Sequence, residues 1–342
     1  MEFLQTNRSV KCLFYFFILL FISLCVYKVI AQIYSPYWLE LSDTANGVVT
    51  GKPQWIAYQN RLLGPYLVQF ISGIGISNVS AVKVFSLLTI TIQNLVLFGL
   101  LSKTGIPNHR SLMYIVFYSF VFIGIQNYGF YTWDSIDAIL FTLFAWGIFQ
   151  GRSTTYFVYL FLAAIINRES ALFISLYLVI DSFQFSLDDL SKMKIYLVSK
   201  TKLAIGSFLT IGGILYTKLI RDYLFISQSN GFSDSAHRQI GNQIHFYKNI
   251  LDLFFNNLTS LNILNSIFIL GSVIYLAYFI KYFTDRQLKA FVVFIILVVN
   301  ILIFGLINEI RMYIILVPFL IFFQIEMEKL KSVQERRINN QS

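Results

Sequence analysis

Charged residues are scarce in this chain. Asp, Glu, Lys and Arg make up 13% of its 342 residues, whereas hydrophobic residues make up 57%, and the mean hydropathy is +0.67. A soluble domain of this length does not need so apolar a surface. The composition therefore excludes an ordinary soluble protein and predicts a polytopic membrane protein.

Cysteine and recognisable cofactor motifs are also nearly absent. The two cysteines, Cys12 and Cys25, both lie in the first apolar run and offer neither a disulfide framework nor a metal-ligand spacing. Asp234, His237 and His245 follow no recognised ligand spacing either. No Gly-rich phosphate loop and no internal repeat is evident. The sequence therefore identifies no cofactor, and no motif supports the binding of a divalent metal.

The net charge of +9 does not indicate nucleic-acid binding. Lys and Arg are distributed over loops, and most of them gather in the segments that one side of a membrane would hold. This is the bias of cytoplasmic loops in membrane proteins. It predicts a multi-pass membrane protein with both termini in the cytoplasm.

The apolar runs set the expected fold class. One span takes about 20 residues, so the chain has room for about ten. We predict an all-α, polytopic transmembrane protein with a single integral-membrane domain over 1–342. The runs are 12–31, 80–101, 111–126, 135–150, 153–167, 169–182, 203–220, 262–281, 289–307 and 311–326.

Between these runs lie the expected outer loops 32–79 and 221–261, a cytoplasmic loop at 183–202 and a C-terminal tail at 327–342. The apolar stretch 62–76 is too short to span, so we predict an interfacial helix there. Residues 153–182 form either one tilted span or two short helices hinged at 167–169. The hinge is favoured because a single span would bury Arg168 and Glu169 near mid-bilayer.

Two charged clusters lie in apolar stretches that are otherwise expected to be buried in lipid: Asn167-Arg168-Glu169 and Asn308-Glu309-Ile310-Arg311. An ionisable group at membrane depth costs several kcal/mol, so such groups usually face a cavity and have a function. The expected topology brings both clusters to the outer face. They form either an internal ion pair between helices or a polar pocket that contacts a substrate, and the pocket is favoured.

The first outer segment holds Glu40, Asp43 and Arg61. A carboxylate just outside the first span can act as a general base or hold a cation, and Arg61 can pair with a phosphate. The alternative is ordinary interfacial polarity, with Arg61 anchoring a surface helix. Spacing alone favours this alternative.

The second outer loop holds Asp134 and Asp137, which face the same way if a helix begins there. Asp134 is either a helix N-cap or, with Asp137, a group that faces a substrate. The neighbouring Tyr128, Tyr131 and Trp133 either stack on a sugar ring or belong to an interfacial aromatic belt.

Several of these stretches resemble the GT-C superfamily of membrane glycosyltransferases, in particular its uncharacterised bacterial branch. The stretches are Tyr58-Gln-Asn-Arg61-Leu-Leu-Gly-Pro65, Trp133-Asp134, Asn167-Arg168-Glu169 and Glu309-Ile-Arg311. Members of this superfamily have many spans, an acidic residue in the first extracytoplasmic loop followed by interfacial helices, and arginines that bind a polyprenyl-phosphate sugar.

The resemblance implies roles for individual residues. Asp43, with Glu40, would be the catalytic carboxylate that takes a proton from the acceptor hydroxyl, while Arg168 and Arg311 hold the departing phosphate. Glu169 and Glu309 would orient these arginines, and Arg61, Asp134 and Asp137 are further substrate contacts. The Glu40-x-x-Asp43 spacing departs from the family's Asp-x-Asp or Glu-x-Asp pair, which leaves the metal requirement and the identity of the base open.

The expected partners are the lipid bilayer, a polyprenyl-linked sugar and a glycan acceptor. An O-antigen or exopolysaccharide polymerase is a close variant of this function. A transporter or flippase for a lipid-linked or anionic solute is the rival from another class, and a structural membrane subunit is a third hypothesis. Transport ranks second because transporters usually show paired repeats with binding sites at the midplane, whereas the charged clusters here lie toward one face.

Overall fold

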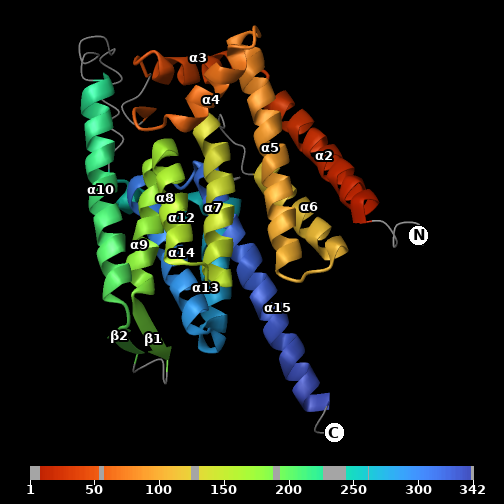
Figure 1. The fold of residues 1–342 in the computed structure, drawn as a ribbon, viewed down its shortest axis with the longest axis vertical. Coiled ribbons are helices and arrows are strands. Elements are labelled where there is room, and N and C mark those ends of the chain that lie inside the picture. Colours follow the sequence, from red (N-terminus) through yellow and green to blue (C-terminus); the bar gives the residue numbers. More distant parts are fainter. Residues whose placement is uncertain are drawn as a thin grey trace. The chain divides into compact units, whose positions relative to one another are not determined.

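The structure, a computed structural model, describes residues 8–53, 58–124, 131–187, 193–225, 244–260 and 262–339. Helices dominate it (Figure 1). In chain order they are α2 (Arg8–Ile33), α3 (Trp38–Val49), α4 (Leu63–Ser72), α5 (Asn78–Lys103), α6 (Asn108–Gly124), α7 (Thr132–Gln150), α8 (Thr154–Asn167), α9 (Leu172–Asp181), α10 (Lys200–Phe225), α12 (Phe246–Phe254), α13 (Ile263–Phe279), α14 (Asp285–Phe304) and α15 (Val317–Asn339). Short 3-10 helices are η2 (Glu169–Ala171), η4 (Asn256–Thr259), η5 (Ile280–Tyr282) and η6 (Ile310–Ile315).

Every predicted apolar run forms a helix, so the all-α class is confirmed apart from one small sheet. In the part of the chain that the structure describes, six helices are long and apolar enough to cross a membrane: α2, α5, α7, α10, α13 and α14. Helices α6, α8 and α9 have 17, 14 and 10 residues, which is less than the usual span. The count of about ten spans therefore stays a prediction.

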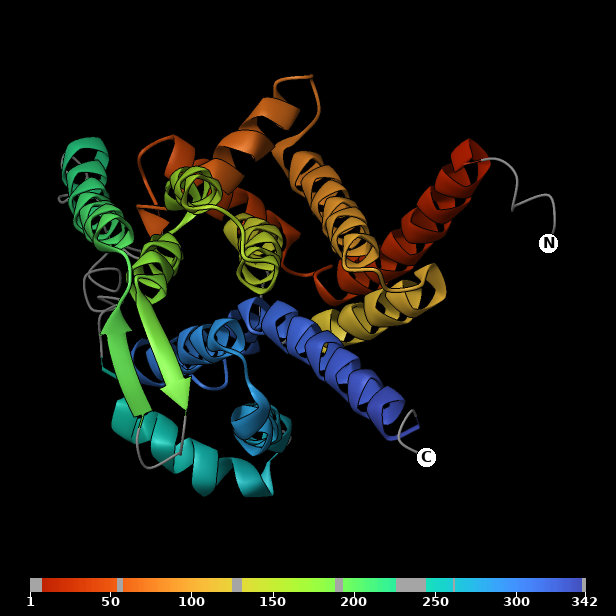
Figure 2. The same ribbon diagram turned by 60° about the horizontal axis from the view of Figure 1, so that its bottom comes forward.

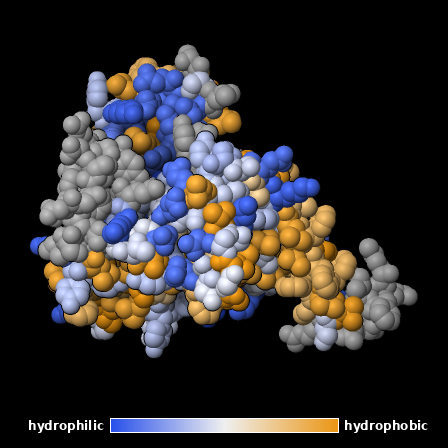
Figure 3. All heavy atoms as spheres, turned by 90° about the horizontal axis from the view of Figure 1, so that it is seen from above, coloured by the Kyte–Doolittle hydropathy of each residue, from blue (hydrophilic) through white to orange (hydrophobic). Residues whose placement is uncertain are grey.

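The chain divides into two compact units. Unit 1 comprises Met1–Leu140, Ile166–Arg168 and Ile220–Gln239, and unit 2 comprises Phe141–Ile165, Glu169–Leu219 and Ile240–Ser342. In unit 1, α2, α5 and α6 lie side by side (Figures 1 and 2). Helix α2 exposes Leu13, Phe17 and Phe21, and the flank that carries it is hydrophobic in Figure 3. Such a flank suits contact with lipid.

The predicted outer loop 32–79 contains two helices, α3 and α4, that pack against each other and against α5. Helix α3 buries Trp38, Leu41, Ala45 and Val48, the spacing of one helical face. Helix α4 covers most of the predicted interfacial helix 62–76 and leaves Phe70 exposed. Within the other predicted outer loop, 221–261, the second half is helical, whereas residues 226–243 lie outside the described residues.

The core of unit 2 is aromatic. Phe144 of α7 meets Phe157 of α8, Tyr177 of α9 and Phe319 of α15, with ring centroids 5.8–6.2 Å apart and edge-to-face geometry. Such pairs stabilise by about 0.5–1.5 kcal/mol beyond the burial of their area. Phe144 of α7 therefore contacts three other helices. The charged predicted tail 327–342 is mostly a continuation of α15.

Helices α8 and α9 form a short antiparallel hairpin, as the hinge prediction required. Helix α8 ends at Asn167, and α9 begins after the turn η2. The rings of Phe157 and Tyr177 are 4.7 Å apart, and these residues are equally distant from Asn167 along the chain. The turn Asn167-Arg168-Glu169 is therefore the tip of the hairpin.

The predicted cytoplasmic loop 183–202 contains an antiparallel two-stranded sheet, made of β1 (Phe183–Leu187) and β2 (Met193–Leu197). An all-helical prediction missed this sheet. The alternation of Phe183, Gln184 and Phe185 is the period of a strand, but it follows an apolar helical run directly, which hides the change of period.

Helices α9 and α10 approach closely at a glycine, which gives a stability test. A Cβ on Gly206 would lie 2.8 Å from Val179 N, whereas a Cβ on Gly212 of the same helix would meet nothing within 4 Å. We expect Gly206→Ala to lower the free energy of unfolding by about 1–3 kcal/mol, because the clash is with backbone. Gly212→Ala is expected to leave it unchanged or to raise it slightly. Thermal unfolding in detergent measures both, and equal shifts would contradict this packing.

Candidate functional site

The first turns of α7 carry a buried pair of carboxylates in unit 1. Asp134 and Asp137 share one face of the helix, as their spacing predicted, and both are buried. Nη1 of Arg168 lies 3.1 Å from Oδ1 of Asp134 and 3.4 Å from Oδ2 of Asp137. One guanidinium nitrogen therefore bridges two carboxylates, which offsets the cost of burying their charge.

Asp134 also helps to begin the helix. It is the third residue of α7, and its Oδ2 accepts the backbone N–H of Tyr131 at 3.2 Å. In a capping box, the side chain of the third helical residue accepts the N–H of the N-cap residue, and this contact is that half of the motif. Asp134 is therefore not the N-cap residue that the sequence suggested, although its carboxylate satisfies the N–H of the residue before the helix as well as the ion pair.

Asn167 locks the hairpin tip onto α7. Its Nδ2 donates to the backbone oxygen of Trp133 at 2.9 Å and to Oδ1 of Asp137 at 2.8 Å. The residue before it, Ile166, accepts the backbone N–H of Leu62 at 3.1 Å. Three segments far apart in the sequence are therefore tied together where the charges meet.

Aromatic rings form the other side of this cluster. The rings of Tyr131 and Trp133 stack 4.9 Å apart, and Tyr58 lies 4.8 Å from Trp133. The guanidinium of Arg61 lies over both Tyr58 and Trp133, 5.4 and 5.0 Å from the ring centroids. Cation–π contact contributes more where the cation is desolvated, and Arg61 is buried.

Gly64 allows α4 to pack closely against the start of α7. A Cβ at this position would lie 2.8 Å from the carbonyl carbon of Thr132 and 2.9 Å from the backbone nitrogen of Trp133. Helix α4 can therefore approach the start of α7 only if residue 64 lacks a side chain. Because Arg61 lies two residues before the start of α4, this approach also positions Arg61 over the rings.

Exposure differs within the cluster. The side chain of Arg168 is 21% exposed, whereas those of Asp134 and Asp137 are 3% and 2% exposed. A ligand arriving from outside therefore meets the guanidinium before the carboxylates. Within the described residues, Oδ1 of Asn167, Nε1 of Trp133 and Oγ1 of Thr132 are buried without a hydrogen-bond partner. Buried orphan groups of this kind are often part of functional sites or bind ordered water.

The structure does not bring Glu40 and Asp43 into this cluster. Both are exposed on α3, and Asp43 lies about 140° around the helix from Val48, which packs against Tyr58 and Trp133. Neither carboxylate has an ion-pair or hydrogen-bond partner for its side chain among the residues described. Both are accessible carboxylates outside the buried face of α3.

The second predicted cluster lies in unit 2. Glu309 and Arg311 pair at 3.5 Å, as expected for a carboxylate that orients an arginine. The buried Asn249 of α12 fixes this turn: its Nδ2 donates to the backbone oxygens of Leu302 and Gly305 at 2.8 and 2.7 Å. Its Oδ1 accepts the backbone N–H of Ile307 at 3.0 Å.

The partners of Arg168 differ from those predicted. The sequence pointed to Glu169 as the carboxylate that orients Arg168, and to Glu309 or Arg311 as partners across helices. The structure pairs Arg168 with Asp134 and Asp137 instead, and Glu169 belongs to unit 2. Arg168 lies between the end of α8 and the start of η2, so no common helix fixes its direction relative to that of Glu169.

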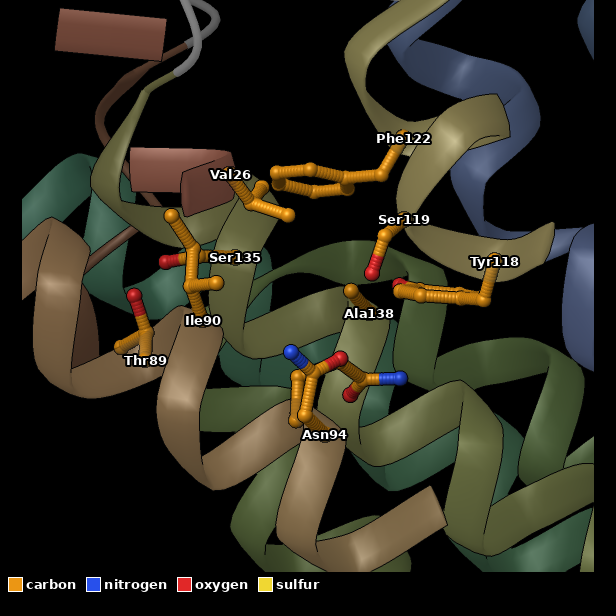
Figure 4. A pocket seen from close by; sticks show the side chains of 10 residues that line it. Val26, Thr89, Ile90, Asn94, Tyr118, Ser119, Phe122, Ser135 and Ala138 are labelled. Carbon is orange, nitrogen blue, oxygen red and sulfur yellow. The ribbon is translucent and has the colours of Figure 1, made fainter. Parts of the chain in front are cut away.

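Sequence reasoning missed a second polar feature of unit 1, a small cavity among α2, α5, α6 and α7 (Figure 4). Its accessible volume of about 10 Å³ is close to the smallest that holds one water molecule. Asn94 donates to Ser23 at 2.9 Å beside it, and the side chain of Ser119 points into it. The signal was present as Gln93-Asn94 in the middle of an apolar run. The lining is uncharged: Val26, Thr89, Ile90, Gln93, Asn94, Tyr118, Ser119, Phe122, Ser135 and Ala138.

No protein-family model, curated protein or solved structure matches this chain. Over the described ranges, no three His, Cys, Asp or Glu side chains are grouped so that they could hold a metal ion. Asp234, His237 and Tyr128 lie outside these ranges. The geometry of the site therefore carries the functional argument alone.

The ion pair predicts unequal effects of two aspartate substitutions. Asp137→Asn removes a buried charge that Arg168 and Asn167 both contact, and we expect it to lower the free energy of unfolding by about 1–3 kcal/mol. Asp43→Asn replaces an exposed carboxylate that has no partner in the described part of the chain, and it is expected to stay within about 0.5 kcal/mol of wild type. Thermal unfolding of the purified proteins compares them, and a shift as large for Asp43→Asn would contradict the assigned ion pairs.

Proposed function

We propose that this protein is a membrane glycosyltransferase that moves a sugar from a polyprenyl-phosphate donor to a glycan or lipid-linked acceptor. The proposal places about ten spans in a bacterial inner membrane, with both termini in the cytoplasm and the site at the outer face. The observation that carries it is the cluster of two arginines, two carboxylates and three aromatic rings at one end of α7. This combination suits a sugar phosphate.

The arginines suit the phosphate. A guanidinium binds two oxygens of a phosphate through its planar fork, and Arg168 is the most exposed member of its ion-pair cluster. Asp134 and Asp137 set the position of Arg168, so its charge is held in place before the phosphate begins to leave. Fixed charge of this kind stabilises the negative charge that develops in the transition state. Arg311 pairs with Glu309 and belongs to unit 2, and only the resemblance makes it a candidate for a second phosphate contact.

The aromatic rings suit the sugar. Tyr131 stacks on Trp133, and Tyr58 lies tilted against both rings. Trp133 and Tyr58 are buried, whereas Tyr131 is half-buried, so the face of Tyr131 can pack against the apolar surface of a sugar ring. The carboxylate that takes the acceptor proton must be unpaired and accessible. Asp43 and Glu40 are accessible, and neither side chain has a partner among the described residues, but both lie outside the cluster. The resemblance, and not the geometry of the cluster, assigns this role to Asp43, with Glu40 as the alternative.

Transport of a lipid-linked or anionic solute is the second candidate, and one observation favours it. Helices α8 and α9 are each too short to span a bilayer, and their hairpin ends in a charged tip. Discontinuous helices of this kind line the binding sites of many transporters. The two functions differ in one requirement: a transferase makes a new covalent product in detergent, whereas a transporter needs two compartments.

The test is the lipid-linked and surface glycan profile of a deletion strain, measured by mass spectrometry. Arg168→Lys keeps a positive charge for Asp134 and Asp137 but loses the planar fork, so we expect at least a tenfold loss of product. Asp43→Asn is expected to lose product to a similar extent, because an amide accepts no proton from the acceptor. Wild type is expected to restore the profile.

Arg110→Lys is the matched control, because Arg110 is an exposed arginine of α6 outside the cluster. It is expected to restore the profile as wild type does, with membrane levels of all variants matched. A deletion strain whose glycans are unchanged would overturn the transferase. Full restoration by Arg168→Lys would overturn the assigned phosphate contact.

A further inference from the structure

The two-stranded sheet of unit 2 is amphipathic. Phe183 is paired with Leu197, and Phe185 with Ile195. Residues paired directly across an antiparallel sheet project to the same face, and successive residues alternate between faces. The four apolar side chains therefore share one face, while Gln184 and its partner Tyr196 lie on the other.

The apolar face is incompletely covered by protein. Ile195 and Leu197 are 51% and 46% exposed, and the following Val198 is 63% exposed. On the other strand, the backbone N–H of Phe185 donates to Oδ1 of Asp285 at the start of α14, at 2.8 Å. An isolated two-stranded hairpin is marginally stable in water. A further partner packed on the apolar face of β2 would bury the side chains that the protein leaves exposed.

The hairpin adjoins a membrane-spanning helix. Strand β2 ends at Leu197, and α10 begins at Lys200, so the strand lies where α10 enters the bilayer. Figures 1 and 2 show both strands at one end of α9 and α10. The backbone oxygen of Ser182 accepts the N–H groups of Val198 and Ser199 at 2.8 and 3.1 Å. These bonds hold the hairpin at the depth of the helix ends.

A charge network at the same place fixes this arrangement. Asp181 accepts from Nζ of Lys202 at 2.6 Å and from Nζ of Lys289 at 3.0 Å, and Lys289 also pairs with Asp285 at 2.8 Å. Lys200 is exposed at the first turn of α10. Lysines at the membrane surface attract anionic lipid head groups. Both the exposed apolar face and the neighbouring positive charge therefore suit the boundary between head groups and acyl chains.

We propose that the β1–β2 hairpin is a membrane-surface anchor whose apolar face inserts into the lipid leaflet at the ends of α9 and α10. The occupant of this face is lipid. The side chains of Ile195 and Leu197 lie in the acyl boundary, and those of Gln184 and Tyr196 face the aqueous phase. This anchor shares no residue with the proposed glycosyl-transfer site.

Site-directed spin labels test the proposal with neighbouring positions. In full-length protein with Cys12→Ser and Cys25→Ser, single cysteines replace Ile195 or Tyr196, carry a nitroxide, and are reconstituted in vesicles of phosphatidylethanolamine and phosphatidylglycerol. The label at 195 is expected to collide mainly with oxygen, which concentrates in the bilayer. The label at 196 is expected to collide mainly with a water-soluble nickel chelate.

Leu197→Cys and Gln184→Cys repeat the comparison, so one misfolded variant does not decide it. Equal access of the chelate to labels at 195 and 196 would overturn the proposal, because the hairpin would then lie in water. Protection of the label at 195 from both reagents would also overturn it, because the face would be covered by protein, such as a second copy of the chain.

Discussion

The ion pair between Arg168 and the two buried carboxylates of α7 is the interaction on which unit 1 depends. An unpaired charge at this depth is strongly disfavoured, because removing one partner of a buried ion pair leaves the other charge uncompensated. Arg168 reaches Asp134 and Asp137 because α8 stops at Asn167 and the chain turns there. The ion pair thus fixes where the hairpin turns and which end of α7 it meets.

The same contacts prepare a site for an anion. Asn167 joins the hairpin tip to the backbone of Trp133, and the ring of Trp133 supports Arg61. The positions of two positive charges therefore follow from one set of buried hydrogen bonds and ring contacts. Groups held in this way need little reorganisation when charge develops on a substrate, which is the property that electrostatic catalysis requires.

Local sequence patterns predicted the helices and the break at Asn167, because hydrophobicity and the cost of buried charge are local properties. The shared face of Asp134 and Asp137 followed from their spacing. The partner of Arg168 did not, because that contact joins residues 31 and 34 positions apart and depends on how the α8–α9 hairpin packs. The strand at Phe183 was hidden by the apolar helix before it. Helix α3 was missed although Leu41, Ala45 and Val48 have helical spacing.

Binding of a polyprenyl phosphate to the purified protein tests the central claim most directly. Native mass spectrometry would compare polyprenyl phosphate with the uncharged polyprenol of equal chain length, for wild type and for Arg168→Lys. The account predicts that wild type prefers the phosphate and that Arg168→Lys loses most of this preference while still binding the polyprenol. Equal affinity of wild type for the two lipids, or an unchanged preference in the variant, would contradict the assignment of Arg168 as the phosphate contact.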